Sequence, residues 1–211
     1  MKLAIRGMLL SAALFLAACG GGAGTTASNE TVTAADCDPN NPATFAECGT
    51  VLIGFTDADG DFLNYTVDVL SLELETANGR VVETLPRKTR INFTDYVDLT
   101  ELVAAVTIPP ATYVSGKIRL DYTDAEVYVA DGDGSRKAVV KRRDGAVLTQ
   151  TELKIRLSNR DQLRIRRGKA ALLQLDFDLD ASHEVDMSVT PADAFSEQFI
   201  LAEVTPVDEK D

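Results

Sequence analysis

Hydrophobic and polar residues alternate along several short stretches of this chain, and this alternation limits what the chain can fold into. Over residues 173–180, Leu or Phe occupies every second position and Gln or Asp the positions between. Residues 51–55 and 117–122 alternate in a similar way. Because successive side chains of a strand point to opposite faces, each stretch predicts a strand with one buried face. The pattern therefore predicts an all-β fold.

Turn sequences that contain Gly or Pro separate these stretches. They lie at 59–60, 78–79, 109–110, 131–134, 144–145 and 167–168. Short strands at this spacing predict one antiparallel β-sandwich over residues 49–205, with at most one short helix. That helix, or a turn that crosses a sandwich edge, is expected between Tyr96 and Val106, where apolar residues are spaced by three and four.

The first 18 residues have the pattern of an export signal. Lys2 and Arg6 precede an apolar run over residues 8–18, which is too short to cross a bilayer as a helix of about 20 residues. The run ends in Leu-Ala-Ala before Cys19, and three Gly residues follow. This resembles the lipobox of bacterial lipoproteins, which implies lipidation of Cys19 and, with Gly20 next, anchoring in the outer membrane. The alternative is an ordinary secretory signal with an incidental cysteine.

Charge and composition describe the rest of the mature chain. Removal of residues 1–18 leaves 19 Lys and Arg residues against 33 Asp and Glu residues, a net charge of −14. A nucleic-acid partner is not expected, because nucleic-acid binders neutralise phosphates with an excess of cations. Residues 19–48 predict a flexible Gly-, Ser- and Thr-rich tether that ends in a small cysteine loop. Residues 206–211 predict a disordered acidic tail.

Cys37 and Cys48 form an even pair at the end of this tether. In an oxidising compartment, two cysteines that close so short a loop predict a disulfide, which typically stabilises a fold by about 3 kcal/mol. A metal or redox pair is the alternative. The spacing is not Cys-x-x-Cys, however, and no His lies nearby in the sequence.

Two segments carry more specific patterns. In residues 51–72, a first strand ends in Thr-Asp-Ala and a second strand follows with a Val-rich stretch. Later, Val-Asp-Leu at 97–99 precedes Pro-Pro-Ala-Thr-Tyr at 109–113. Both resemble an uncharacterised family of bacterial lipoprotein domains, domain of unknown function 4382, in which Gly is usual at the position of Ala111. The resemblance implies a transthyretin-like, or prealbumin-like, β-sandwich on a lipid tether, with no established activity.

The turn that contains Asp57, Asp59 and Asp61 is a candidate calcium site. Three carboxylates at alternate positions supply the hard oxygen ligands that Ca²⁺ prefers. The turn lies between predicted strands, which excludes an EF-hand, and further ligands would come from Asn64, Asp131 or Asp133. The alternative is that Asp and Gly only form a tight turn. No other cofactor is expected.

Cations alternate with apolar residues along two neighbouring runs. Lys154 and Arg156 lie in the first run and Arg164 and Arg166 in the second, and a turn at 158–161 would join the runs into a hairpin with one basic face. That face is a candidate binding surface for an acidic polysaccharide or for lipopolysaccharide phosphates. The alternative is a solvated face that is neutralised by cross-strand ion pairs with Asp176, Asp178 and Asp180.

Enzyme signatures are mostly absent: the sequence contains no Gly-x-Ser-x-Gly, His-Glu-x-x-His or Walker motif, and it has a single His, His183, and no Trp. The leading hypothesis is a non-catalytic ligand-binding or adhesion module of the bacterial envelope, attached to the membrane by its N-terminal lipid. The second hypothesis is a structural or accessory envelope protein that docks a protein partner by a sheet edge. A hydrolase is the third, and it needs a cleft that converges on His183 or on a carboxylate pair.

Overall fold

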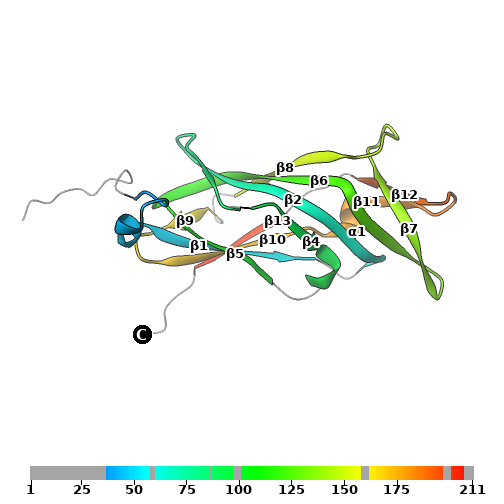
Figure 1. Ribbon diagram of the computed structural model, residues 1–211, viewed down its shortest axis with the longest axis horizontal. Helices are drawn as coiled ribbons and strands as arrows, with labels where there is room; N and C mark the ends of the chain where they lie inside the picture. The colour runs from blue at the N-terminus through cyan, green and yellow to red at the C-terminus, as the bar shows by residue number, and fades with distance from the viewer. Residues whose placement is uncertain are drawn as a thin grey trace, which may run out of the picture. The chain divides into compact units, whose positions relative to one another are not determined.

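The computed structural model describes residues 37–57, 60–85, 87–96, 101–157, 162–196 and 201–206. Within them, two β-sheets enclose one hydrophobic core (Figure 1). The smaller sheet has four strands in the order β13-β10-β1-β5. Their bounds are β1 (Gly49–Thr56), β5 (Glu101–Ile108), β10 (Ala170–Asp176) and β13 (Leu201–Pro206). No helix of the described residues is long and apolar enough to cross a membrane.

The larger sheet has nine strands within the described residues, and two long strands form its centre. β2 (Phe62–Thr76) pairs antiparallel with β6 (Ala111–Asp131) along most of its length. The other side of β6 pairs with β9, β8 and β7 in turn, and β3 and β4 pair with β2. β12 and β11 continue the sheet beyond β7. The bounds are β3 (Val81–Glu83), β4 (Thr89–Asn92), β7 (Gly134–Lys141), β8 (Gln150–Arg156), β9 (Leu163–Ile165), β11 (His183–Asp186) and β12 (Ala192–Ser196).

The predicted all-β sandwich is confirmed, but its sheets are mixed rather than wholly antiparallel. β1 pairs parallel with β10, and β7 pairs parallel with β12. Alternation of apolar and polar residues identifies the faces of a strand but not the direction of its neighbour. Most of the larger sheet lies between β1 and β10 in the sequence. This long connection allows the two strands to lie side by side in the same direction.

The alternating residues form the core as predicted. Val51, Ile53 and Phe55 of β1 are fully buried, as are Leu173 and Leu175 of β10. A group of aromatic rings closes one end of this core. The rings of Phe93 and Phe177 have centroids 4.1 Å apart, and those of Phe55 and Phe177 are 5.2 Å apart.

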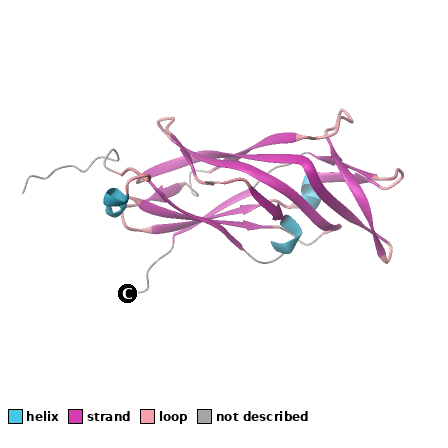
Figure 2. Ribbon diagram, viewed as in Figure 1, coloured by secondary structure: helices cyan, strands magenta, loops and turns pink. Residues whose placement is uncertain are grey.

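The predicted turns are also confirmed where they are described (Figure 2). Gly79, Gly132, Gly145 and Gly168 have φ angles of 82°, 59°, 83° and 63°. These values lie in the left-handed region, where Gly has no steric penalty. The Gly in each of these four turn sequences therefore reflects the backbone conformation that the turn requires.

The helix or turn expected between Tyr96 and Val106 is wrong for residues 101–106, which belong to β5. A short 3-10 helix (Phe93–Tyr96) precedes them, and residues 97–100 lie outside the described residues. Against β1, Ile53 pairs with Ala104 and Gly54 with Leu102, so Val103 is an extra residue in a β-bulge. A bulge interrupts the two-residue period, which explains the spacing that suggested a helix.

The Cys37–Cys48 disulfide is present and closes the segment in front of β1. Its two Cα atoms are 5.1 Å apart, and both cysteines are buried. The loop between them contains a 3-10 helix (Pro42–Glu47), whose first turn is capped by the Asn41 side chain. The first described residue, Cys37, is therefore covalently fixed to the start of β1.

The close approach of β2 and β6 predicts a steric requirement at Gly116. A Cβ at this position would lie 2.6 Å from the Glu73 carbonyl oxygen on β2. We expect Gly116→Ala to lower the free energy of unfolding by about 1–3 kcal/mol, as overpacking usually does. Thermal unfolding should show a midpoint several degrees lower, at about 2–4 °C per kcal/mol.

Gly134→Ala is the matched control, because its Cβ would have no neighbour closer than 3.6 Å. Equal melting temperatures for the two variants would contradict the steric explanation.

Candidate functional site

β8, β9 and the first residue after β9 carry the predicted basic residues, but the two strands do not form the predicted hairpin. β8 pairs antiparallel with residues 115–121 of β6, and β9 pairs antiparallel with residues 111–113 of the same strand. The two segments therefore follow each other in one direction along one side of β6. The hairpin prediction is wrong because both runs find the same long partner, and alternation alone does not reveal a shared partner.

The four predicted cations are exposed along this side of the sheet. Lys154, Arg156, Arg164 and Arg166 project outward, while the apolar residues between them are buried. Within the described residues, none of the four side chains forms an ion pair or a hydrogen bond. Glu152 is the acidic residue of β8, and its carboxylate pairs with Lys117 of β6 at 3.5 Å. We refer to the four cations as the basic edge.

The acids expected to neutralise the basic edge lie elsewhere, so the predicted cross-strand ion pairs are wrong. β10 pairs with β1 and β13 in the smaller sheet, because the turn at 166–169 carries the chain from one sheet to the other. Asp176 ends β10, about 20 Å along the strand from its start at Ala170. The Asp178 carboxylate accepts a hydrogen bond from Ala181 N–H at 3.0 Å, and that of Asp180 accepts one from Asp61 N–H at 3.0 Å.

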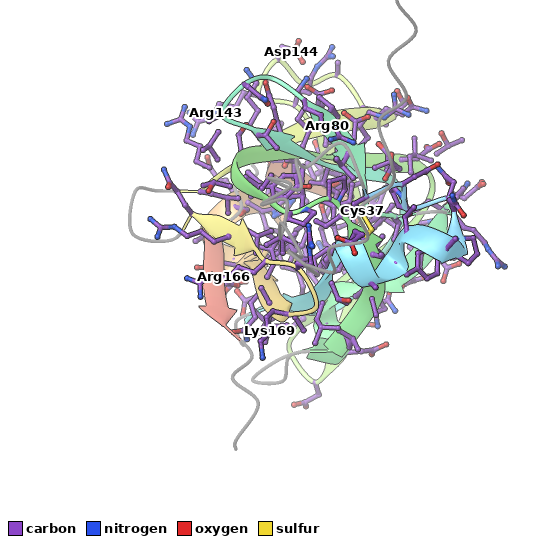
Figure 3. All side chains as sticks on the ribbon, turned by 90° about the vertical axis from the view of Figure 1, so that its left-hand side faces the viewer. Cys37, Arg80, Arg143, Asp144, Arg166 and Lys169 are labelled. Carbon is purple, nitrogen blue, oxygen red and sulfur yellow. A yellow bond between two sulfur atoms is a disulfide. The ribbon has the colours of Figure 1, made fainter. Side chains whose placement is uncertain are left out.

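The turn that follows β9 is fixed to the disulfide segment. Gly168 N–H donates to the Cys48 carbonyl oxygen at 2.7 Å, and the Arg167 guanidinium lies 2.6 Å from the Glu47 carboxylate. A Cβ on Gly49 would collide with the Arg166 carbonyl oxygen, so the two backbones are in direct contact. Figure 3 views this end of the domain, where Cys37, Arg166 and Lys169 are labelled. The basic edge thus ends where the described chain begins.

The acidic turn is hydrogen-bonded to α1 (Leu179–Ser182) through the Asp57 carboxylate and the Asp61 backbone. The buried Asp57 side chain accepts a hydrogen bond from Leu179 N–H at 2.9 Å, at the first residue of the helix, whose N-cap is Asp178. Asp180 accepts from Asp61 N–H, as described above. Asp59 lies outside the described residues. Among the residues that are described, no group of three or more His, Cys, Asp or Glu side chains is arranged to hold a metal ion, and the calcium site at Asp57, Asp59 and Asp61 stays a prediction.

Two of the three further suggested calcium ligands, Asn64 and Asp131, have protein partners of their own. Asn64 accepts a hydrogen bond from the Thr66 hydroxyl at 3.0 Å, and Asp131 pairs with Arg136 at 2.6 Å. The backbone nevertheless brings this second loop close to the acidic turn, since Ala130 N–H donates to the Asp61 carbonyl oxygen at 2.8 Å.

His183 is half-buried at the start of β11. Its Nε2 lies 2.9 Å from the Tyr65 hydroxyl, and its Nδ1 lies 2.8 Å from the Leu179 carbonyl oxygen. Because a carbonyl can only accept, Nδ1 carries the hydrogen and Nε2 accepts from Tyr65. Burial lowers the pKa of His183 to about 4, against a smaller opposing effect of the Leu179 bond. The ring is therefore neutral near pH 7.

A β-bulge in β6 adds Tyr122 to the hydrogen-bonded group of His183 and Tyr65. Residues 122–125 of β6 lie opposite the single residue Val67 of β2. Tyr122, at the start of the bulge, places its hydroxyl 3.3 Å from that of Tyr65. Phe62 packs against the His183 ring at a centroid distance of 5.1 Å. No local sequence motif marks this network, because its members come from strands that are far apart in the chain.

The hydrolase hypothesis needs a cleft that converges on His183 or on a carboxylate pair. A small open pocket borders His183. Its lining includes Arg143, Ser182 and Glu184. Both ring nitrogens of His183 are engaged with Tyr65 and Leu179, and the buried Ser182 hydroxyl donates to the Phe177 carbonyl oxygen at 3.2 Å. These bonds hold α1 against β2 and β11.

Comparison with protein families identifies the domain. Residues 48–192 match the family described as a domain of unknown function (DUF4382). The chain belongs to the DUF4382 family. The DUF4382 match covers more than half of the chain and includes both the basic edge and His183. No curated protein and no solved structure matches the chain.

The low pKa of His183 predicts a loss of stability in acid. Between about pH 6.5 and 4, the unfolded chain binds a proton at this residue and the folded chain does not. The free energy of unfolding therefore falls as the pH decreases, by at most about 1.4 kcal/mol per pH unit from this residue. We expect the stability advantage of the native protein over His183→Gln to shrink over this interval.

Denaturant unfolding of both proteins between pH 7.5 and 4.5 measures this difference. The variant also serves as the control for the carboxylates, which titrate in both proteins. Parallel pH profiles would show that His183 is protonated equally well in the folded and unfolded chains.

Proposed function

We propose that this DUF4382 protein is an envelope lipoprotein, anchored in the outer membrane by a lipid on Cys19, whose β-sandwich is a non-catalytic binding module for acidic ligands. The lipobox-like pattern supports the anchor. The basic edge supports the binding role, and it is the observation that carries the proposal. Unpaired surface cations on an acidic domain create a local positive potential that favours anionic ligands.

The arrangement of the acids strengthens this argument. On a mature chain with a net charge of −14, carboxylates outnumber cations, and Lys88, Arg90, Arg136 and Lys141 each pair with one. The four cations of the basic edge have no such partner within the described residues, and they follow one another along β8, β9 and the first residue after β9. An extended acidic polymer, such as a polysaccharide or the phosphates of lipopolysaccharide, matches this linear spacing.

A second candidate function is a structural or accessory envelope protein that docks a partner by a sheet edge. β5 favours it, because among the described residues β5 pairs only with β1. Residues 102–108 of β5 carry no charge, and Leu102 is 54% exposed. An uncharged free edge is able to accept an added strand.

The anchor proposal predicts the mass and location of the mature protein. We expect the mature chain to begin at Cys19 and to carry the mass of attached acyl chains, which intact-protein mass spectrometry measures. Cys19→Ala should move the protein from the membrane fraction to the soluble fraction, because no other segment is proposed to insert. A mature chain that begins elsewhere and carries no lipid would contradict the proposal.

The binding proposal predicts salt-dependent affinity for acidic polymers. We expect dextran sulfate and polygalacturonate to bind the mature protein, and Lys154→Gln/Arg156→Gln and Arg164→Gln/Arg166→Gln each to weaken binding by roughly tenfold, or about 1.4 kcal/mol. Affinity should fall between 50 and 300 mM salt, as exposed charges are screened. Fluorescence titration measures both effects.

Arg87→Gln/Lys137→Gln removes the same charge outside the basic edge and is the matched control. Equal weakening in the control would indicate a general charge effect. Failure of both polymers to bind would favour the partner-docking function of β5.

A further inference from the structure

We propose that the end of β9 and the turn after it, residues 164–169 (the basic turn), dock on the phosphate head groups of the bilayer that anchors the chain, so that the domain rests on the membrane with this end down. The inference rests on the lipid anchor of the proposed function and names the ligand of one end of the basic edge. The residues that carry it are Arg164 and Arg166, which project outward without ionic partners within the described residues.

The contacts of this turn place it beside the segment that leads to the anchor. Gly168 and Arg167 bind Cys48 and Glu47, and the disulfide joins Cys48 to Cys37. Thr50 N–H also donates to the Lys169 carbonyl oxygen at 2.9 Å, which fixes the end of the turn to β1. The turn therefore cannot move away from Cys37 without breaking the start of the smaller sheet.

The local charge at this end is opposite to that of the whole protein. Residues 164–169 contain four cations and no acid, and the disulfide segment 37–48 contains two acids, Asp38 and Glu47. Glu47 is paired with Arg167. Residues 20–36 contain Glu30 and Asp36 but no Lys or Arg. Any cation that meets a head group near the anchor must therefore come from the folded domain.

The length of the chain between the anchor and the domain makes this contact accessible. Cys19 and Cys37 are 18 positions apart, a distance that covalent geometry limits to about 60 Å. A lipid on Cys19 thus holds the turn at a high local concentration near the bilayer, where a patch of modest affinity suffices. The attraction acts within a Debye length of about 8 Å, so it requires close approach.

Acidic residues at the opposite end of the domain favour the same orientation, because an anionic bilayer surface repels them. Asp176, Asp178 and Asp180 lie at the other end of β10 from the basic turn, and the acidic turn at Asp57 and Asp61 lies beside them. An anionic surface repels this end and attracts the other. The His183 pocket, which adjoins α1, then faces away from the bilayer.

Vesicle binding by the chain from residue 19 onward, with Cys19→Ser so that no lipid is attached, tests the inference. This chain contains the whole compact unit of residues 32–211. We expect sedimentation with vesicles of 30% phosphatidylglycerol in phosphatidylcholine and little with phosphatidylcholine alone. A cation near an anionic surface changes partitioning by roughly fivefold, so Arg164→Gln/Arg166→Gln should reduce it by about 25-fold.

Two matched variants make the result specific. Arg87→Gln/Lys137→Gln removes the same charge at other sites and should change partitioning by less than about threefold. Lys154→Gln/Arg156→Gln, further along the basic edge, should have a smaller effect on vesicles than Arg164→Gln/Arg166→Gln, although both should weaken polymer binding equally. Unchanged thermal midpoints confirm that the variants are folded.

The possible failures are distinguishable. Equal binding to both vesicle types, equal loss in the control, or no binding at 50 mM salt overturns this inference, whatever Cys19 carries. A Cys19 without lipid overturns the anchor, and with it the proposed orientation, even if the unlipidated chain binds vesicles. Polymer binding without vesicle binding leaves the proposed function intact and removes the membrane as its ligand.

Discussion

The ladder between β2 and β6 is the constraint on which most of the larger sheet depends. β3 and β4 pair with the outer side of β2, and β7, β8 and β9 pair with the outer side of β6. The bulge at residues 122–125 marks the point where the partner of β6 changes from β8 to β7. It also brings Tyr122 to the hydroxyl of Tyr65. This one bulge thus marks where β6 changes its partner strand and brings the hydroxyls of Tyr122 and Tyr65 together.

Much of the fold could be predicted from the sequence, because burial and turn geometry are local. Leu173 and Leu175 are buried where alternation placed them, and Gly79 and Gly168 have the positive φ angles that their turns require. Strand partners could not be predicted, because they depend on residues that are distant in the chain. The predicted β8–β9 hairpin is wrong for this reason. The predicted helix before Val106 is wrong because the bulge at Val103, which forms only against β1, concealed a strand.

The candidate site was predictable in part. The cations Lys154, Arg156, Arg164 and Arg166 were identifiable from their alternation, since an exposed face needs no partner to be recognised. Their lack of ionic partners was not, because it depends on β10 lying in the other sheet. The environment of His183 was also hidden, since its hydrogen-bond partner Tyr65 is 118 positions away in the sequence. The family match leaves the activity of the domain open, so its chemistry has to be argued from these side chains.

The disulfide also decides how the domain carries mechanical load. A pull on the N-terminal segment reaches Cys37 and passes through the sulfur atoms to Cys48, bypassing the 3-10 helix between them. It then enters β1 at Gly49, in a strand that is hydrogen-bonded on both sides, to β10 and to β5. If the far end of the domain is held, the pull runs along the axis of β1 and loads many ladder bonds in shear at once, instead of opening them one by one. The four-stranded sheet is thus suited to hold under tension.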